Sequence, residues 1–272
     1  MAYKILFLDI DGTLLNSAGQ ITAATHQAIA TIQRAGIAVV LASGRPYQGM
    51  LRFSQELELS THSSYMISFN GGKIVDLHTN TIVYEREMEQ SQAQQVFALA
   101  QKLKLAVLTY NEHGIVTAQP NNPYVQHEST ITRLPFVPFE GDAAKLDFPI
   151  HKCLVVGETE QLIAAETVFR ETLGDTIAVC RSSPIFLEVT PAGVDKAAAI
   201  SILLQKLGIP VAESVACGDG FNDVPMIRLA GLGVALDNAP QGVKDAAHLI
   251  VASNDADGVA MAIQHCWSEL FV

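Results

Sequence analysis

Two aspartates near the start of the chain have the residue types and spacing for covalent chemistry. Asp9 and Asp11 directly follow the apolar run at residues 5–8, and Gly12 after them permits a sharp turn. Such a run predicts a buried parallel strand, and open α/β sheets carry their active sites at the carboxyl ends of their strands. One carboxylate can attack an electrophile while the other, in different surroundings, transfers a proton. The structural alternative is an aspartate-rich turn that only closes the strand.

Three later loops place polar residues in comparable positions. Ser43 and Gly44 follow a second apolar stretch and precede a predicted helix, whose first N–H groups can hold a phosphoryl oxygen. Lys196 falls in the first turn of a predicted helix, where a cation is unfavourable unless anions lie nearby. Asp219 and Asp223 follow another predicted strand and are suited to Mg²⁺. Taken singly, these features also fit a helix cap, a solvated lysine and an acidic turn.

Together the four loops predict one phosphoryl-transfer site. A parallel sheet gathers the carboxyl ends of its strands at one edge, so the loops should converge there. An anionic nucleophile that attacks a phosphate needs the phosphate charge neutralised, and Mg²⁺ and Lys196 would do this. The net charge of −11 and the lack of a Lys/Arg run argue against a nucleic-acid partner.

The order of the elements predicts a doubly wound, parallel, Rossmann-like α/β sheet. Helices are expected near residues 22–34 and 46–57, between apolar strands that include 37–42 and 65–69. After residue 84 the pattern changes to a mixed one, and the parallel pattern returns later. We therefore predict a catalytic core of residues 1–84 and 187–272, with a smaller α+β domain inserted at residues 85–186.

The four motifs Asp9–Thr13, Ser43–Arg45, Lys196 and Gly218–Asp223, in this order, resemble those of the haloacid dehalogenase superfamily of Mg²⁺-dependent phosphatases. The long insert resembles the type IIB cap of the Cof-like subgroup. The Asn70-Gly71-Gly72 turn and the closing segment 254–260 also resemble that subgroup.

The resemblance implies a role for each matching residue. Asp9 is the nucleophile, which forms an aspartyl-phosphate and binds Mg²⁺, and Asp11 is the general acid/base, with its backbone carbonyl on the metal. Asp219 ligates the metal directly, and Asp223 lies behind it or binds it through water. The phosphate is held by the Ile10 backbone, Ser43, Gly44, Lys196 and Asn222, with a contribution from Arg45.

The expected function is hydrolysis of a small phosphorylated metabolite, such as a sugar phosphate. A phosphomutase or phosphotransferase would share the first step and pass the phosphoryl group to a second acceptor. A phospho-aspartate signalling receiver also combines acidic residues with a lysine, but the acid/base at Asp11 and the large insert argue against it. A catalytically silent binding protein is disfavoured by the intact motifs.

Recognition of the leaving group is expected in the insert. Its polar stretch at residues 111–133 has no assigned helix or strand, and the candidate substrate-binding residues there and just before it are Tyr110, His113, Tyr124 and His127.

The apolar runs and the cysteines indicate in which cellular setting the protein is expected to work. No run approaches the ~18 residues of a membrane span, and Asp9 and Asp11 interrupt the N-terminal run too early for a secretory signal. The four cysteines lack zinc-site spacing. We expect a soluble cytoplasmic protein, a monomer or weak homo-oligomer, without a nucleic-acid or membrane partner.

Overall fold

The computed structural model describes residues 3–271, which divide into two compact units. The first unit contains the chain up to Gly44, Leu51–Tyr84, and the chain from Asp195 onward. The second contains Arg45–Met50 and Glu85–Val194. Among the residues described, no helix combines the length and apolar character needed to cross a membrane.

A mostly parallel sheet forms the centre of the first unit. Its eight described strands lie in the order β14-β13-β12-β1-β2-β3-β4-β5, and the pairs from β14 to β3 are parallel, whereas β3 and β4 are antiparallel. The strands are β1 Ile5–Leu8, β2 Ala38–Ala42, β3 Ser64–Ser68, β4 Lys73–Asp76, β5 Thr81–Glu85, β12 Ser214–Gly218, β13 Leu232–Leu236 and β14 Leu249–Val251. The predicted doubly wound α/β class is confirmed.

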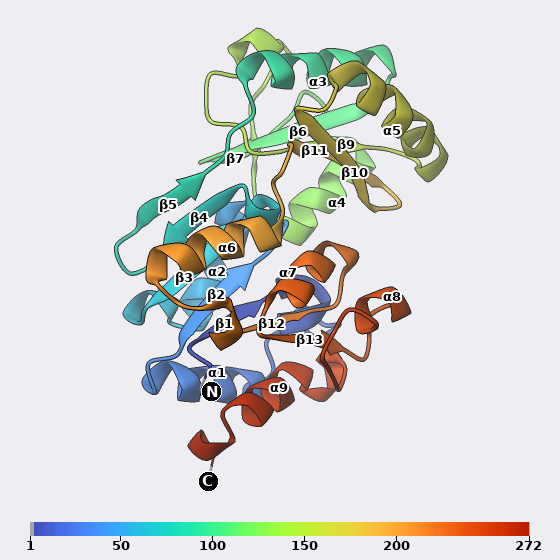
Figure 1. Ribbon diagram of the computed structural model, residues 1–272. Coiled ribbons are helices and arrows are strands. Elements are labelled where there is room, and N and C mark those ends of the chain that lie inside the picture. The colour runs from blue at the N-terminus through green and yellow to red at the C-terminus, as the bar shows by residue number, and fades with distance from the viewer. Residues whose placement is uncertain (1–2, 272) are drawn as a thin grey trace. The chain divides into compact units, whose positions relative to one another are not determined.

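Helices cover both faces of this sheet (Figure 1). They are α1 Ala23–Arg34, α2 Tyr47–Glu56, α6 Lys196–Leu207, α7 Val224–Leu229, α8 Gln241–Lys244 and α9 Gly258–Cys266. Ile5 and Phe7 of β1 pack on the face covered by α6 and α7, in one buried cluster with Ile200 and Leu203. On the opposite face α1 and α9 pack against each other. Burial on both faces explains why β1 is a continuous apolar run.

Two polar caps set where the helices begin. Thr22 accepts a hydrogen bond from the Thr25 N–H and starts α1, in agreement with the helix expected near residues 22–34. Asp195 accepts from the Ala198 N–H and starts α6, so that Lys196 is the first residue of that helix. The structure therefore fixes a cation at the positive end of a helix dipole.

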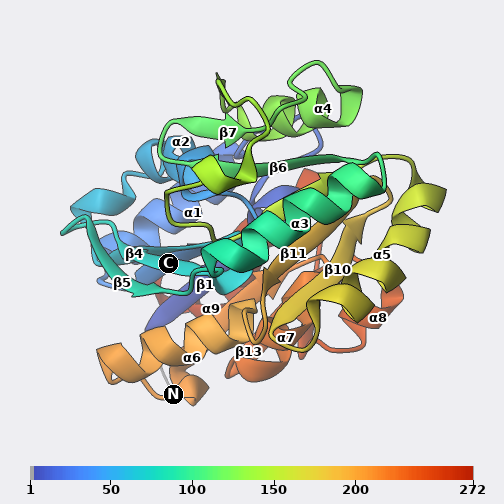
Figure 2. The ribbon, with the colours of Figure 1, turned by 90° about the horizontal axis from the view of Figure 1, so that it is seen from above.

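The second unit has its own sheet, with six described strands in the order β10-β11-β9-β6-β7-β8. Helices α3 and α5 lie over this sheet (Figure 2), and their apolar faces enclose a core that includes Phe97 and Phe169. The elements are α3 Gln90–Lys102, β6 Ala106–Asn111, β7 Gly114–Val116, α4 Pro123–Thr132, β8 Phe136–Val137, β9 Cys153–Val156, α5 Thr159–Leu173, β10 Ile177–Ser183 and β11 Phe186–Pro191.

Two features of this unit differ from the sequence-based description. Strand β11 pairs with β9 and β10, so the unit runs to Val194, whereas the sequence analysis ends the insert at Phe186. The polar stretch at 111–133 also contains β7 and α4. Asn122 caps α4 and Pro123 opens it, but only a few of its side chains are buried, which hides the apolar face in the sequence.

The turn after β1 is tightly packed. Gly12 has φ of +78°, and a Cβ at this position would lie 2.3 Å from Asp219 Oδ2. Gly19, in the same connection, also has positive φ (+71°), but no neighbouring atom lies within 4 Å of a Cβ there. Both glycines therefore have a positive φ, but only at Gly12 do neighbouring atoms occupy the space that a Cβ would need.

This pair provides a matched test of the turn. Gly19→Ala should lower the free energy of unfolding by about 1 kcal/mol, the cost of a left-handed non-glycine residue. Gly12→Ala should cost roughly 1–3 kcal/mol more, because the added methyl also displaces Asp219 or the turn. Urea denaturation followed by the fluorescence of Trp267, the single tryptophan, measures both. Equal losses in the two variants would contradict the packing argument.

Candidate active site

A buried lysine joins two of the predicted aspartates. Lys196 Nζ lies 2.6 Å from Asp9 Oδ1 and 2.5 Å from Asp223 Oδ1, and all three side chains are buried. The anions that its helix-terminal position demands are therefore present. This contact connects residues far apart in the chain, at the carboxyl ends of β1 and β12 and at the start of α6.

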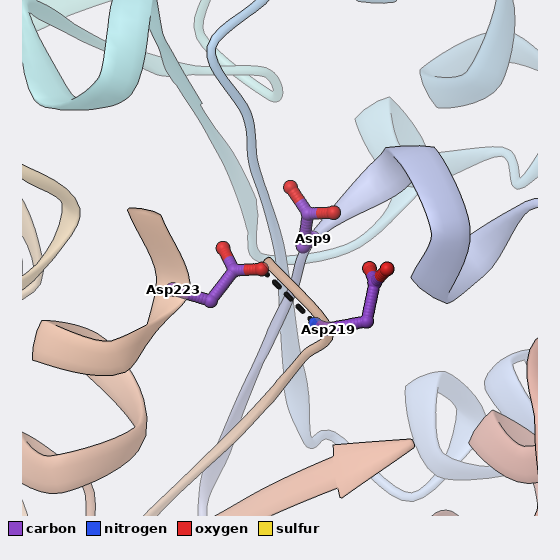
Figure 3. Close-up of side chains that lie close together, drawn as sticks. All are labelled: Asp9, Asp219 and Asp223. Carbon is purple, nitrogen blue, oxygen red and sulfur yellow. Dashed lines mark hydrogen bonds between the residues drawn. The ribbon is translucent and has the colours of Figure 1, made fainter. Parts of the chain in front are cut away.

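The second oxygen of Asp223 shapes the loop after β12. It accepts hydrogen bonds from the Asp219 N–H at 3.0 Å and the Gly220 N–H at 2.8 Å, and Figure 3 shows the first of these contacts. Both carboxylate oxygens of Asp223 are thus held by protein donors. A Cβ at Gly218 would lie 2.5 Å from the Cβ of Asp223, so this close approach requires glycine.

The Asp219 carboxylate accepts hydrogen bonds from two side chains outside the loop after β12. Its Oδ1 accepts from the Thr13 hydroxyl at 2.7 Å, and its Oδ2 accepts from Asn238 Nδ2 at 3.2 Å. Asp9, Asp219 and Asp223 each present one carboxylate oxygen within 4.8 Å of the other two (Figure 3). Asp11, by contrast, is exposed and lies outside this group of three.

The electrostatics of the group favour an added cation. Burial raises the pKa of the Asp9 carboxyl well above its ordinary value, and repulsion from Asp223 adds to this against the opposing effect of Lys196. Burial also raises the pKa of Asp219 to about 6, partly offset by its hydrogen bond from Thr13. Burial alone would lower the pKa of Lys196, but attraction to Asp223 and Asp9 outweighs it and raises that pKa. Three carboxylates face one ammonium group.

These residues fit a hard divalent cation such as Mg²⁺, which takes oxygen ligands and retains several waters. Asp9 and Asp219 are the more suitable direct ligands, because each oxygen of Asp219 accepts one hydrogen bond, whereas Asp223 Oδ2 already accepts two and Asp223 Oδ1 is paired with Lys196. The geometry is compatible with the position behind the metal that the resemblance implies for Asp223.

The predicted phosphate-binding residues meet through Asn70. Ser43 is buried, and its carbonyl accepts from the Asn70 N–H at 2.9 Å. A Cβ at Gly44 would lie 3.0 Å from Asn70 Nδ2, and Asn222 Nδ2 donates to Asn70 Oδ1 at 3.2 Å. Asn70 therefore links the loop after β2 to the loop after β12.

In the sequence, the Asn70 turn stands out only by its resemblance to the Cof-like subgroup. Its signal was available, since an asparagine at the carboxyl end of a predicted parallel strand lies on the edge where the other loops meet. Thr13 and Asn238 were overlooked as contributors to the site, although Asn238 also follows an apolar strand.

The predicted contacts in the second unit have separate partners. Arg45 is grouped with this unit, where its Nη1 donates to the Ile131 carbonyl at 2.7 Å. Tyr124 donates to Glu158. The His113 side chain is 73% exposed beside Glu112, and the His127 ring lies 6.0 Å from that of Phe186. The sequence listed these residues together, but these contacts place them in different surroundings.

Tyr110 belongs instead to a buried polar network. Its hydroxyl donates to Glu128 Oε1 at 2.8 Å, and burial raises the pKa of Tyr110 well above its ordinary value. Lys152 Nζ lies 3.2 Å from Glu188 Oε1 and 5.7 Å from the centre of the Tyr110 ring. His151 contacts Glu85 at 2.7 Å. Lys152 and Glu188 interrupt or flank apolar strands, which is the sequence signal that would have identified them.

Comparisons with known proteins identify the family of this chain. A model of the haloacid dehalogenase-like hydrolases matches residues 6–263. The protein YxeH of Bacillus subtilis (strain 168), which carries a provisional phosphatase assignment, is 32% identical over 262 residues, covering 96% of this chain and 97% of that protein.

Solved structures give the same result. A haloacid dehalogenase-like hydrolase from Bacteroides thetaiotaomicron is 38% identical with a TM-score of 0.93, covering 97% of this chain and 99% of that one. A subclass IIB sugar phosphatase is 27% identical with a TM-score of 0.79, covering 96% and 98%. The motifs, the fold and these relatives lead to one conclusion: the chain belongs to the haloacid dehalogenase-like hydrolase family and is a phosphatase of the Cof-like subgroup.

Proposed function

We propose that this phosphatase hydrolyses a small phosphorylated metabolite, such as a sugar phosphate, through an aspartyl-phosphate on Asp9, and that it requires Mg²⁺. The observation that carries the proposal is the buried Asp9 carboxylate, 2.6 Å from Lys196 within the group of three aspartates. A structural carboxylate needs only one such partner, whereas this arrangement has an excess of negative charge that a cation and its phosphate ligand would complement. Bound Mg²⁺ would supply charge neutralisation for the transferred phosphoryl group.

In the first step Asp9 attacks phosphorus. One Asp9 carboxylate oxygen forms the new P–O bond while the ester P–O bond breaks and the alkoxide leaves. Lys196 holds Asp9 Oδ1, which restricts the rotation of the nucleophile and places positive charge beside the phosphoryl oxygens. The second step is attack of water on the aspartyl-phosphate, which releases inorganic phosphate and restores Asp9.

Asp11 would move the protons of both steps. It lies two residues after the nucleophile and is exposed, so its carboxyl can reach a leaving group that the buried carboxylates cannot. It would protonate the departing alkoxide and then accept a proton from the attacking water. Its neighbour Ile10 would offer its backbone N–H to the phosphate.

The remaining core residues would orient the phosphate. The Ser43 hydroxyl, the Gly44 N–H and the Asn222 amide are neutral donors from two loops that Asn70 connects. Neutral donors suit a phosphate already balanced by a metal ion and Lys196.

The second unit would serve as the cap that recognises the leaving group of the substrate. The network of Tyr110, Glu128, Lys152 and Glu188 supplies hydrogen-bond donors and acceptors inside an otherwise apolar unit, which suits a leaving group rich in hydroxyls. Two relatives support this class, since one is titled a sugar phosphatase and another is named 5-amino-6-(5-phospho-D-ribitylamino)uracil phosphatase, which is 29% identical. In this proposal the enzyme works in the cytoplasm as a monomer or weak homo-oligomer, without nucleic acid or membrane.

The nucleophile is tested by Asp9→Asn. The substitution keeps the shape and removes the attacking charge, so phosphate release from sugar phosphates should fall at least ~1,000-fold. Mass spectrometry of the acid-quenched native enzyme should find phosphate on the peptide that contains Asp9. Far-UV circular dichroism checks that the variant is folded. Substantial turnover by folded Asp9→Asn would refute the aspartyl-phosphate route, and a phosphorylated second acceptor in place of free phosphate would identify a transferase.

The acid/base role of Asp11 predicts a dependence on the leaving group. Asp11→Asn should slow sugar-phosphate hydrolysis by about 100- to 10,000-fold. It should slow formation of the phospho-enzyme much less with p-nitrophenyl phosphate, whose leaving group needs little protonation. Rapid-quench measurements of the first turnover separate this step from hydrolysis of the intermediate. An equal slowing of the first step for both esters would argue against the role.

The cap is tested by removing one hydroxyl from its buried network. Tyr110→Phe should change the ratio of kcat/KM between sugar phosphates and p-nitrophenyl phosphate by about tenfold, because Glu128 loses its donor. The control is Gln126→Ala, which removes an exposed side chain of the same helix as Glu128 and should leave the ratio unchanged. If both variants kept the native ratio, recognition would lie elsewhere.

A further inference from the structure

The Asn238 amide contacts two parts of the active site that are distant in sequence. Asn238 follows β13, and its Nδ2 donates to the Gly12 carbonyl at 2.8 Å and to Asp219 Oδ2 at 3.2 Å. The first contact holds the turn that carries Asp9 and Asp11. The second holds the aspartate suited to be a direct metal ligand. One amide group thus fixes the separation between the two loops.

Asn238 is itself held by the next loop. Its Oδ1 accepts from the Asn254 N–H at 3.1 Å, and Asn254 Nδ2 donates to the Leu15 carbonyl at 2.8 Å. Ser17 and Asp255 add a further pair of contacts between the same two segments. The loops after β1, β12, β13 and β14 therefore form a connected hydrogen-bonded chain. This network gives a physical role to the closing segment 254–260, which in the sequence is distinguished only by its resemblance to the Cof-like subgroup.

The chemistry of Asn238 suits a carboxylate that must accept a metal. Asp219 is repelled by Asp223, so without neutral donors its orientation would be poorly fixed. Thr13 and Asn238 each donate to a different oxygen of Asp219. Hydrogen bonds of this kind orient ligating carboxylates, and their loss reduces metal affinity by about 10- to 100-fold. Asn238 is exposed, so its side chain contributes little to the buried core.

We propose that Asn238 is a positioning residue that holds Asp219 and the Gly12 turn in the geometry that receives the metal ion, and that Asn254 acts by holding Asn238. The inference rests on the proposed function, because that proposal makes Asp219 a metal ligand. It goes further by assigning part of the metal affinity to loops after β13 and β14, which contribute no metal ligand.

The test is calorimetric titration of Mg²⁺ into the chelator-treated protein without substrate. Asn238→Ala should raise the Kd for Mg²⁺ by about tenfold or more. The Mg²⁺ concentration for half-maximal phosphatase activity should rise in parallel. The melting temperature of the metal-free variant should stay within about 2 °C of the native value.

Two further variants make the result specific. Gln241→Ala removes another exposed amide close by, one that donates to Asp245 and not to Asp219, and should bind Mg²⁺ like the native protein. Asp219→Ala should abolish Mg²⁺ binding. If Asp219→Ala loses binding while Asn238→Ala keeps native affinity, the role of Asn238 is refuted and the metal site stands. If the native protein does not bind Mg²⁺, both the metal site and the role of Asn238 are refuted.

The coupling between Asn238 and Asn254 is tested by combining their alanine substitutions in a double variant. Asn254→Ala should weaken Mg²⁺ binding in the same direction as Asn238→Ala but less. The double variant should bind Mg²⁺ no more weakly than Asn238→Ala alone, since coupled residues give non-additive effects. Additive losses would show that Asn254 acts independently and would overturn that part of the inference.

Discussion

The first unit depends on the ammonium group of Lys196 having no exposed surface and two carboxylate partners. A buried charge is costly unless it is paired and hydrogen-bonded, and removing one partner of such a pair typically costs about 3–5 kcal/mol. Asp9 and Asp223 meet this need from the ends of β1 and β12, and Asp195 caps the helix that carries the lysine. The same contact therefore joins the two halves of the first unit's chain and fixes the orientation of Asp9, the proposed nucleophile.

The remaining charge of the site explains how an acidic protein can bind an anion. The net charge of −11 belongs to the whole chain, whereas the local field depends on groups within a few ångströms. Lys196 balances only part of the charge of Asp9, Asp219 and Asp223, and the protein adds neutral donors from Thr13 and Asn238 rather than another cation. A divalent ion would complete the balance and present a positive surface to phosphate. In the function that we propose, metal binding would thus be linked to substrate binding.

The second unit buries several charged side chains beside an apolar core. Its core is apolar, yet Glu128, Lys152 and Glu188 are buried near Tyr110. Burial raises the pKa of Glu128, while Lys152 and the Tyr110 hydroxyl oppose that shift. Replacing such a network with apolar residues is often neutral or stabilising, so its presence calls for a reason other than folding. The recognition of a hydroxyl-rich leaving group that we propose would supply one.

The sequence by itself determined the features that depend on local chemistry. Apolar runs that end in Asp9, Ser43 and Asp219 mark buried parallel strands and the loops at their carboxyl ends, because burial on both faces leaves no other pattern. The helix near residues 22–34 and the sharp turn at Gly12 followed from helix periodicity and turn chemistry. The parallel topology then implied that these loops converge.

Only the tertiary structure decided which distant groups touch. Asn70, Asn238 and Asn254 look alike in sequence, and each gains its role from a partner in another loop. Strand β11 is apolar apart from Glu188 and Thr190, and its own residues do not specify β9 as its partner. Tyr110 lies in a buried network because Glu128, eighteen residues further along, faces it from α4. Such contacts are determined by strand pairing and register. Pairing and register depend on the packing of the whole sheet rather than on residues that are neighbours in the chain.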